Sequence, residues 1–488
     1  MRRRKDELYP DYSAFITAIK ENGITVELLQ KIIQRHRKNS LYNKGLYDRY
    51  MAVEGGTPID KRTPRYKEKD PINNKINNAF VNEIVNFKTG YLVGKPIGYG
   101  YSNTDEAKAV SGGIAGIDIA TKAITDFVTR NSMHKVDIEI VKRASICGYA
   151  GRLFYIEENT GYERVMPLHA YETIILSNTH IGEPEYAVRY FSTKDVDNNT
   201  KWTVEFYDNT NIYTYEGGTL SSLEEKKVEE HFFNGCPLQG VANNDELIGD
   251  AEPVLALIDD YDKVLSDNSN EIESFVHALL IITVLGDHEQ ISKEMEKANA
   301  NGKLVITPTG TTQVNEPVKW LTKQINDAFT EHHLERLEKN IYRFSNTPNM
   351  SDESFGSASG VSLKFKLHGL ETKCGMCQAQ MESAGQYMWK LLSEVWAIRR
   401  TATIDPLQVV MNFERNFPLD HLSNAQAAQA FIAAGLPEEV AWDIAIPEID
   451  DIDYVKEIKE QEKAVMPLYE SVLTQETQTG TEIDNLNI

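Results

Sequence analysis

Cysteine is scarce in this sequence, and long apolar runs are absent. Four cysteines among 488 residues are too few for disulfides to hold the chain together, which indicates a reducing compartment. The longest apolar stretch, Phe275 to Leu285 with His277 inside it, is far shorter than the roughly 20 residues of a membrane-spanning helix. No opening segment has the pattern of a secretory signal. We therefore expect a soluble protein made in a cytoplasm, with no membrane partner.

Positive charge is also in short supply. The chain has 51 basic and 73 acidic residues, a formal charge of −22. A protein that grips phosphate backbones by counterion release carries the opposite sign, so if DNA is a partner, most of this surface must repel it. The hydrophobic content of 41% is ordinary for globular proteins, and the length allows two or more domains.

Catalytic motifs are missing as well. Residues 90–96 resemble a phosphate-binding loop, but the glycine spacing is one residue short and Pro96 replaces the hydroxyl residue that would hold magnesium. Gly112, Gly113 and Gly116 follow no convincing strand, so we interpret them as a flexible loop and not as a dinucleotide site.

Cys374 and Cys377 form a C-x-x-C pair inside a helical pattern. No second pair at finger-like spacing accompanies them, and a structural zinc needs further ligands. We predict two small buried side chains on a helix. The sequence thus predicts no catalytic residue, no metal site and no cofactor.

The first half of the chain changes from helical to strand-like periodicity. Residues 1–50 and 73–90 have helical patterns, the second ending at Gly90 or Gly94, and the basic run 35–38 is expected to be a solvated face. From Val136 to Phe233 the period approaches two, which predicts a small β-rich domain. Its expected strands are 152–157, 186–191, 201–207 and 211–215, the last two joined by a turn at 208–210.

Asp250 is a candidate N-cap for a helix of some 35 residues with a continuous apolar stripe. The opposite face is polar, so water or another subunit is expected to cover it: Asp259, Asp262, Asp267, Asn270 and Glu273. A compact insert follows, with a charged helix at 289–300 and strands at 303–307 and 318–321. A second amphipathic helix, 324–344, completes an extended arm.

A Gly/Ser-rich segment, 349–360, is too small and polar to contribute to a core and predicts a mobile loop. A third long helix is expected at 367–400, a short strand at 409–413, and a helical tail from 421 to about 463. The end of the chain is expected to be disordered.

Four segments carry a family resemblance. Residues 73–98 read NNKINNAFVNEIVNFKTGYLVGKPIG, and 145–150 read SICGYA. Residues 356–365 read GSASGVSLKF, and 445–451 read AIPEIDD. In these segments the sequence resembles tailed-phage portal proteins, the head-tail connectors, of the type found in siphophages of Gram-positive bacteria.

The resemblance implies a mixed α+β, mainly helical portal-protein fold that assembles into a ring, usually of twelve subunits, with wing, stem, clip and crown regions. The implied boundaries are 1–135 (helical wing), 136–245 (β-rich wing), 246–284 (first stem helix), 285–319 (clip), 320–348 (second stem helix), 349–362 (tunnel loop), 363–418 (long wing helix and strand), 419–465 (crown) and 466–488 (disordered tail).

The resemblance also implies two sets of site residues. The tunnel loop, which projects into a DNA channel, would comprise Met350, Ser351, Asp352, Glu353, Ser354, Phe355, Gly356, Ser357, Ala358, Ser359 and Gly360. The clip face toward the packaging motor would comprise Lys293, Glu296, Lys297, Asn301, Gly302 and Lys303.

The implied partners are further copies of the chain, double-stranded DNA in the channel, the terminase large subunit, a head-tail adaptor, and the major capsid and scaffolding proteins. The implied location is the portal vertex of the virion, after assembly in the host cytoplasm. Two alternatives stay open: another capsid or neck component, or a cytoplasmic enzyme that uses Cys374 and Cys377.

Overall fold

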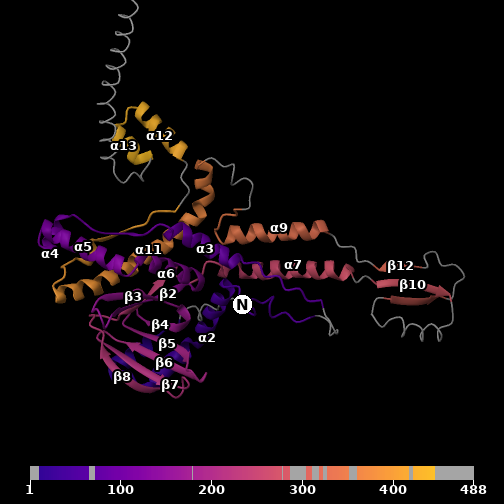
Figure 1. Ribbon diagram of the computed structural model, residues 1–488, viewed down its shortest axis with the longest axis horizontal. Helices are drawn as coiled ribbons and strands as arrows, with labels where there is room; N and C mark the ends of the chain where they lie inside the picture. Colours follow the sequence, from indigo (N-terminus) through magenta and orange to yellow (C-terminus); the bar gives the residue numbers. More distant parts are fainter. Residues whose placement is uncertain are drawn as a thin grey trace, which may run out of the picture. The chain divides into compact units, whose positions relative to one another are not determined.

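The computed structural model describes residues 10–64, 72–178, 180–276, 279–285, 304–309, 318–321, 327–350, 360–416 and 421–445 (Figure 1). The chain divides into two compact units, 1–357 with 364–416, and 358–363 with 417–488. In the described part of the second unit, α12 (His421–Ala433) and α13 (Glu438–Ala445) fall within the predicted helical tail. No helix among the described residues is long and apolar enough to cross a membrane.

The first unit has a mixed α+β fold. Its longer helices are α1 (Ser13–Asn22), α2 (Val26–Tyr50), α3 (Phe80–Val93), α4 (Asp105–Ser111), α5 (Ile114–Arg130), α6 (Met133–Cys147), α7 (Leu255–Val276), α9 (Asp327–Phe344) and α11 (Gly360–Arg399). Its strands are β1 (Gly98–Tyr101), β2 (Tyr149–Ile156), β3 (Glu163–Leu168), β4 (Thr173–Leu176), β5 (Tyr186–Lys194), β6 (Thr200–Tyr207), β7 (Asn211–Gly217), β8 (Glu224–Glu230), β9 (Leu238–Ala242), β10 (Leu279–Leu285), β11 (Leu304–Thr309), β12 (Val318–Leu321) and β13 (Val409–Asn412).

A five-stranded antiparallel sheet, in the order β4-β5-β6-β7-β8, confirms the predicted β-rich region. β6 and β7 form the predicted hairpin, and the Asp208 carboxylate accepts hydrogen bonds from the backbone N–H groups of Thr210 and Asn211 in its turn. Apolar side chains of α1, α2 and this sheet share one core. The edge strand β8 is exposed along its whole length and carries six charged residues, which disfavours pairing with another strand.

The basic run at 35–38 is only partly a solvated face. Arg35, Arg37 and Lys38 are exposed, but His36 is fully buried between α2 and the strands. One ring nitrogen of His36 lies 2.9 Å from the Tyr190 hydroxyl. The expectation of a uniformly solvated run was therefore wrong at its second residue.

The sheet β3-β2-β9 packs against α6, where the sequence pattern had suggested a strand. Residues 136–140 alternate apolar and polar side chains, but the buried positions of α6 also recur at helical spacing, and the helix prevails. Gly148 ends α6 at φ +90°, and a Cβ there would lie 2.0 Å from the Leu247 carbonyl oxygen. Glycine is therefore required at this turn.

The Gly112, Gly113 and Gly116 segment is also more ordered than predicted. Gly112 and Gly113 connect α4 to α5, both with positive φ, and Gly116 lies within α5. The glycines thus make a tight link between two helices.

The helix predicted from Asn73 begins only at Phe80, and residues 72–79 run instead along α7. The polar face of α7 binds this segment and α2. Asn78 donates two hydrogen bonds to Asp262, the Asn74 backbone N–H donates to Asn270 at 2.6 Å, and Arg49 pairs with Asp259. The expectation that water or another subunit covers this face was wrong, since the chain itself covers it.

The long helix predicted from Asp250 was wrong at both ends. Asp250 does not cap it, because a short 3-10 turn, Glu252–Val254, precedes α7. At the other end α7 stops at Val276, and Leu279–Leu285 is strand β10. The 22 residues of α7 span about 33 Å, against about 50 Å for the predicted helix.

The remaining predictions for this region agree better with the structure. Strands β11 and β12 match the predicted insert strands, and β10 lies between them in one sheet. The charged helix predicted at 289–300 lies outside the described residues. Helix α9 matches the second amphipathic helix and packs beside α7 (Figure 1). β13 pairs antiparallel with β1, and α11 begins at Gly360, seven residues before the predicted start.

Candidate functional site

The predicted loop is bounded by two helices whose ends are held in place. Met350 follows α9 and is half-exposed, and Gly360 is the first residue of α11. The predicted loop residues between them, 351–359, lie outside the described residues. Just before the loop, the Asn349 side chain donates a hydrogen bond to Glu338 of α9 at 2.9 Å.

The end of α9 is also fastened to the body of the unit. Lys373 of α11 donates to the Ser345 carbonyl oxygen at 2.9 Å. The Tyr342 hydroxyl donates to Glu83 of α3 at 2.8 Å. Both helices that flank the predicted loop are therefore joined to each other and to α3.

A buried charge network lies beneath these anchors. The Asp250 carboxylate, just before α7, is 3.2 Å from the Lys88 ammonium of α3 and 3.4 Å from the Lys373 ammonium of α11. Asn243 donates to Asp250 at 3.0 Å and accepts a hydrogen bond from Lys88. Lys88 is fully buried, and Asp250 and Lys373 expose 6% and 8% of their surface.

The network carries two positive charges and one negative charge. Burial opposes the charge on Asp250, but the two ammonium groups hold the pKa of its carboxyl below the usual range. Burial also opposes the charge on Lys88, and the Asp250 carboxylate outweighs it and raises the pKa of Lys88. Burial lowers the pKa of Lys373, which is the second cation beside a single carboxylate. Removal of Asp250 would therefore leave both lysines buried without a counterion.

Cys374 and Cys377 are the predicted pair of buried side chains on a helix. They are 0% and 1% exposed in α11. Burial raises the pKa of the Cys374 thiol to about 12, so the thiol stays protonated and unreactive at neutral pH. Across the described part of the chain, no group of three metal-ligating side chains is found.

The predicted clip face lies outside the described residues: Lys293, Glu296, Lys297, Asn301, Gly302 and Lys303. The sequence reasoning missed the charge network altogether. Its signal was Lys88, which continues the apolar stripe of Phe80 and Ile84 at four-residue spacing. A lysine on an apolar stripe needs a buried partner.

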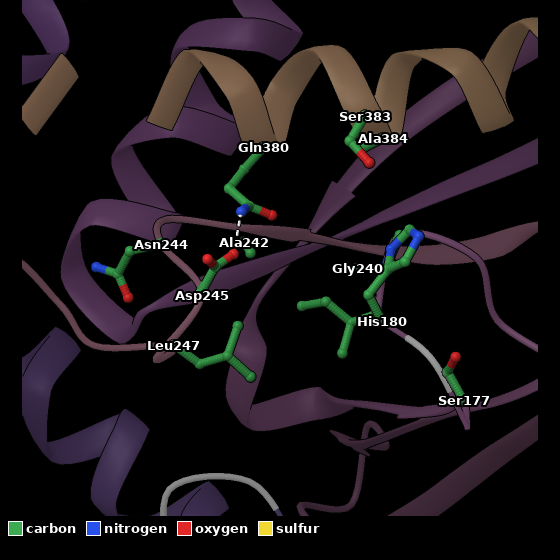
Figure 2. A pocket seen from close by; sticks show the side chains of 12 residues that line it. Ser177, His180, Gly240, Ala242, Asn244, Asp245, Leu247, Gln380, Ser383 and Ala384 are labelled. Atoms are coloured by element: carbon green, nitrogen blue, oxygen red, sulfur yellow. Dashed lines mark hydrogen bonds between the residues drawn. The ribbon is translucent and has the colours of Figure 1, made fainter. Parts of the chain in front are cut away.

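A small pocket of about 190 Å³ lies between α11 and the loops beside β9 (Figure 2). Gln380 of α11 donates to the Asp245 carboxylate at 2.6 Å across its wall. His180 also lines the pocket, and its Nδ1 accepts a hydrogen bond from the Gly182 backbone at 3.2 Å. These contacts tie α11 to the sheets and suggest no nucleophile or acid-base pair.

Comparisons with known proteins agree with one another. The family model described as phage portal protein, SPP1 Gp6-like, matches residues 29–467. The portal protein of Clostridium phage phiCD119 is 23% identical over 460 residues, covering 90% of this chain and 93% of the relative. The portal protein of Bacillus phage SPP1 is 24% identical over 377 residues, covering 73% and 70%.

A solved structure titled as the neck of an empty GTA particle, computed with C6 symmetry, is also similar. It is 8% identical, with a TM-score of 0.38, and the match covers 75% of this chain and 90% of that chain. A likeness at this TM-score carries no argument about the present chain. The family match spans most of the sequence, and on that ground the chain belongs to the SPP1 Gp6-like family of phage portal proteins.

Proposed function

We propose that this chain is one subunit of a ring, of twelve copies, at a single capsid vertex. Double-stranded DNA enters through the ring's channel during packaging and leaves through it during ejection. The observation that carries the proposal is the portal family match over residues 29–467. The role is structural, and the buried, protonated thiols of Cys374 and Cys377 give no support to an enzyme.

The charge of the chain suits passage better than grip. Each copy has a formal charge of −22, so a ring of twelve repels phosphate over most of its surface. DNA that is repelled by the channel slides with little friction. The energy for packaging would then come from a separate terminase motor.

We assign the regions of the ring from chain order. The pair α7 and α9 would form the stem, and residues 285–319 between them the clip, where the terminase large subunit and later a head-tail adaptor dock. The sheets with their covering helices would form the wing, and 419–465 the crown. The major capsid and scaffolding proteins would contact the outer surface of the ring. The mature location is the virion vertex, after assembly in the host cytoplasm.

Residues 350–360 would form the tunnel loop that senses or restrains DNA. Support comes from the anchors on both sides, Ser345 bound by Lys373 and Asn349 bound to Glu338. A Gly/Ser-rich segment between two fixed helix ends can change conformation while its supports stay in place.

Ring closure is the first test. We expect negative-stain electron microscopy of the purified full-length protein to show closed rings with a central hole, and the mass in solution to give the subunit number. Closed particles without a through-hole would favour another capsid or neck component. Monomers at every salt and protein concentration would contradict the proposal.

Shortening the loop is the second test. We expect deletion of 352–358 to leave rings intact, because the anchors lie outside the deletion, and to reduce the nuclease-protected DNA retained in heads at least tenfold. A matched control keeps the loop's length and composition but scrambles its order. Normal packaging and retention in the deletion variant would refute a role for the loop.

A further inference from the structure

A second and larger pocket, of about 680 Å³, lies where three elements end. It is lined by residues from the end of α5, the turn between β2 and β3, and the end of α11. Its volume falls within the range of ligand-binding sites. It lies away from the loop anchors and the charge network, and the proposed function does not use it.

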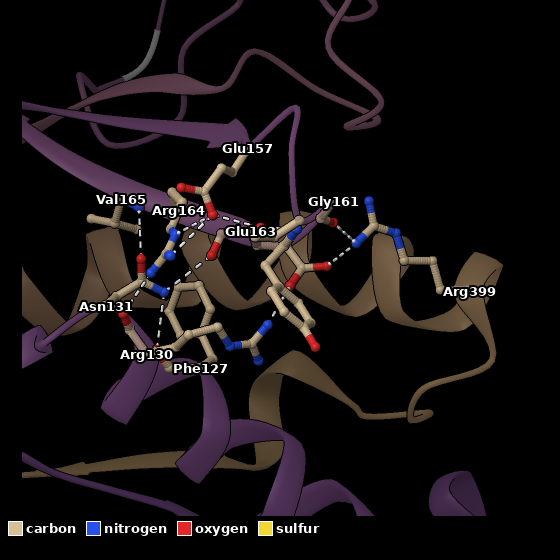
Figure 3. Close-up of polar contacts among 11 residues, drawn as sticks. Phe127, Arg130, Asn131, Glu157, Gly161, Glu163, Arg164, Val165 and Arg399 are labelled. Atoms are coloured by element: carbon tan, nitrogen blue, oxygen red, sulfur yellow. Dashed lines mark hydrogen bonds and ion pairs between the residues drawn. The ribbon is translucent and has the colours of Figure 1, made fainter.

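Two arginines in this pocket share one carboxylate. Glu163, the first residue of β3, is 3% exposed. Arg399, the last residue of α11, donates to one oxygen of Glu163 at 2.7 Å and also to the Gly161 carbonyl oxygen. Arg130, the last residue of α5, lies 3.7 Å from the other oxygen (Figure 3). One carboxylate therefore serves two guanidinium groups.

Arg130 keeps most of its hydrogen-bonding capacity. A guanidinium has five N–H donors, and the contacts found for this one are the long ion pair to Glu163 and a cation–π contact with Tyr162 at 4.1 Å. Its side chain is 25% exposed, so a ligand can reach it. Tyr162 is half-exposed at the same site and offers an aromatic surface beside the charge.

The charges around the pocket select the type of anion. Arg130, Arg399 and the exposed Arg400 face Glu163 and the exposed Asp126, which leaves one excess positive charge. A phosphate dianion would meet two fixed carboxylates, whereas one carboxylate balances the excess charge. The planar guanidinium fork also matches a carboxylate in bidentate geometry. On a chain of charge −22, this excess attracts acidic chains selectively.

We propose that this pocket docks an acidic segment of a partner protein, with a carboxylate side chain on Arg130 and a neighbouring apolar or aromatic side chain against Tyr162. Glu163 holds Arg399 in place and competes with the incoming carboxylate for Arg130. The site is thus an interaction surface for an acidic peptide, separate from the DNA channel.

Fluorescence anisotropy of the full-length protein tests the proposal. The probe is a labelled peptide with blocked ends in which two glutamates flank a phenylalanine, compared with the same peptide carrying glutamines. We expect the acidic peptide alone to bind, and Arg130→Gln to weaken it roughly tenfold, the effect of losing one charge-assisted hydrogen bond. We expect Glu163→Gln to strengthen binding several-fold, because the competing carboxylate is gone.

Arg189→Gln is the matched control. Arg189 also pairs with a glutamate, Glu205 at 3.3 Å, and stacks on an aromatic ring, Phe191 at 4.4 Å, but it lies on β5. The control should bind the peptide as the unchanged protein does. Equal binding of the glutamine peptide, or no effect of Arg130→Gln, would overturn the proposal. So would loss of DNA binding or of ring closure in Arg130→Gln with peptide binding absent throughout, since the occupant would then be nucleic acid or a second copy.

Discussion

Replacement of Asp250 by asparagine is expected to destabilise the protein by about 3–5 kcal/mol, the cost of breaking a buried ion pair by removing one partner. The substitution keeps the shape of the side chain but leaves Lys88 and Lys373 buried beside a neutral amide. The network joins α3 and α11 to the base of α7 and, through Lys373, to the end of α9. Differential scanning calorimetry of the full-length variant should therefore show a large fall in apparent melting temperature.

Two further variants separate the charge effect from a general effect of substitution. Asp245→Asn changes an exposed carboxylate five residues earlier and should alter stability by no more than about 0.5 kcal/mol. Lys373→Met leaves Lys88 and Asp250 as a balanced pair, so it should cost less than Asp250→Asn. Equal melting temperatures for Asp250→Asn and Asp245→Asn would show that the network does not stabilise the fold.

Elements with a clear local pattern were predicted well. The hairpin of β6 and β7 has a turn set by Asp208, and the stripe of α9 buries Leu334, Leu337 and Ile341. Each of these signals lies within a few residues of the element that it predicts. Local sequence is sufficient where a single face is buried and the turn chemistry is strong.

The errors arose where one pattern fits two structures. Val136 to Ile140 alternates like a strand yet also meets the spacing of α6. The apolar run of β10 contains the β-branched residues Ile281, Ile282, Thr283 and Val284, and periodicity alone cannot distinguish a short buried strand from a helix. In both cases tertiary packing decides, and packing is not local.

The candidate site shows the same division. Composition alone indicated a loop at 349–360, but the anchors of its ends join residues 28 or more positions apart, such as Ser345 and Lys373. The polar face of α7 is covered by a segment about 190 residues earlier in the chain, as Ile76 and Ser266 show. Contacts of this range leave no periodic trace in the sequence.

Acidification is expected to destabilise the protein through His36. Burial lowers the pKa of its imidazole to about 3, from about 6.5 in the unfolded chain. Between these values the unfolded chain binds more protons than the folded one, so the stability from neutral His36 is complete above pH 6.5 and is lost as pH falls toward 3. The loss at pH 5 is about 2 kcal/mol.

The difference between variants isolates this contribution from that of the carboxylates. His36→Gln retains a polar group near the Tyr190 and Tyr149 hydroxyls, which lie 2.9 and 3.4 Å from the ring nitrogens. Its melting temperature should therefore fall less than that of the unchanged protein between pH 7.5 and pH 5. His332→Gln, at a side chain 77% exposed on α9, is the control and should follow the unchanged protein. The same pH dependence in all three proteins would mean that His36 protonates as readily in the folded chain as in the unfolded one, which a fully enclosed imidazole between two strands and a helix does not allow.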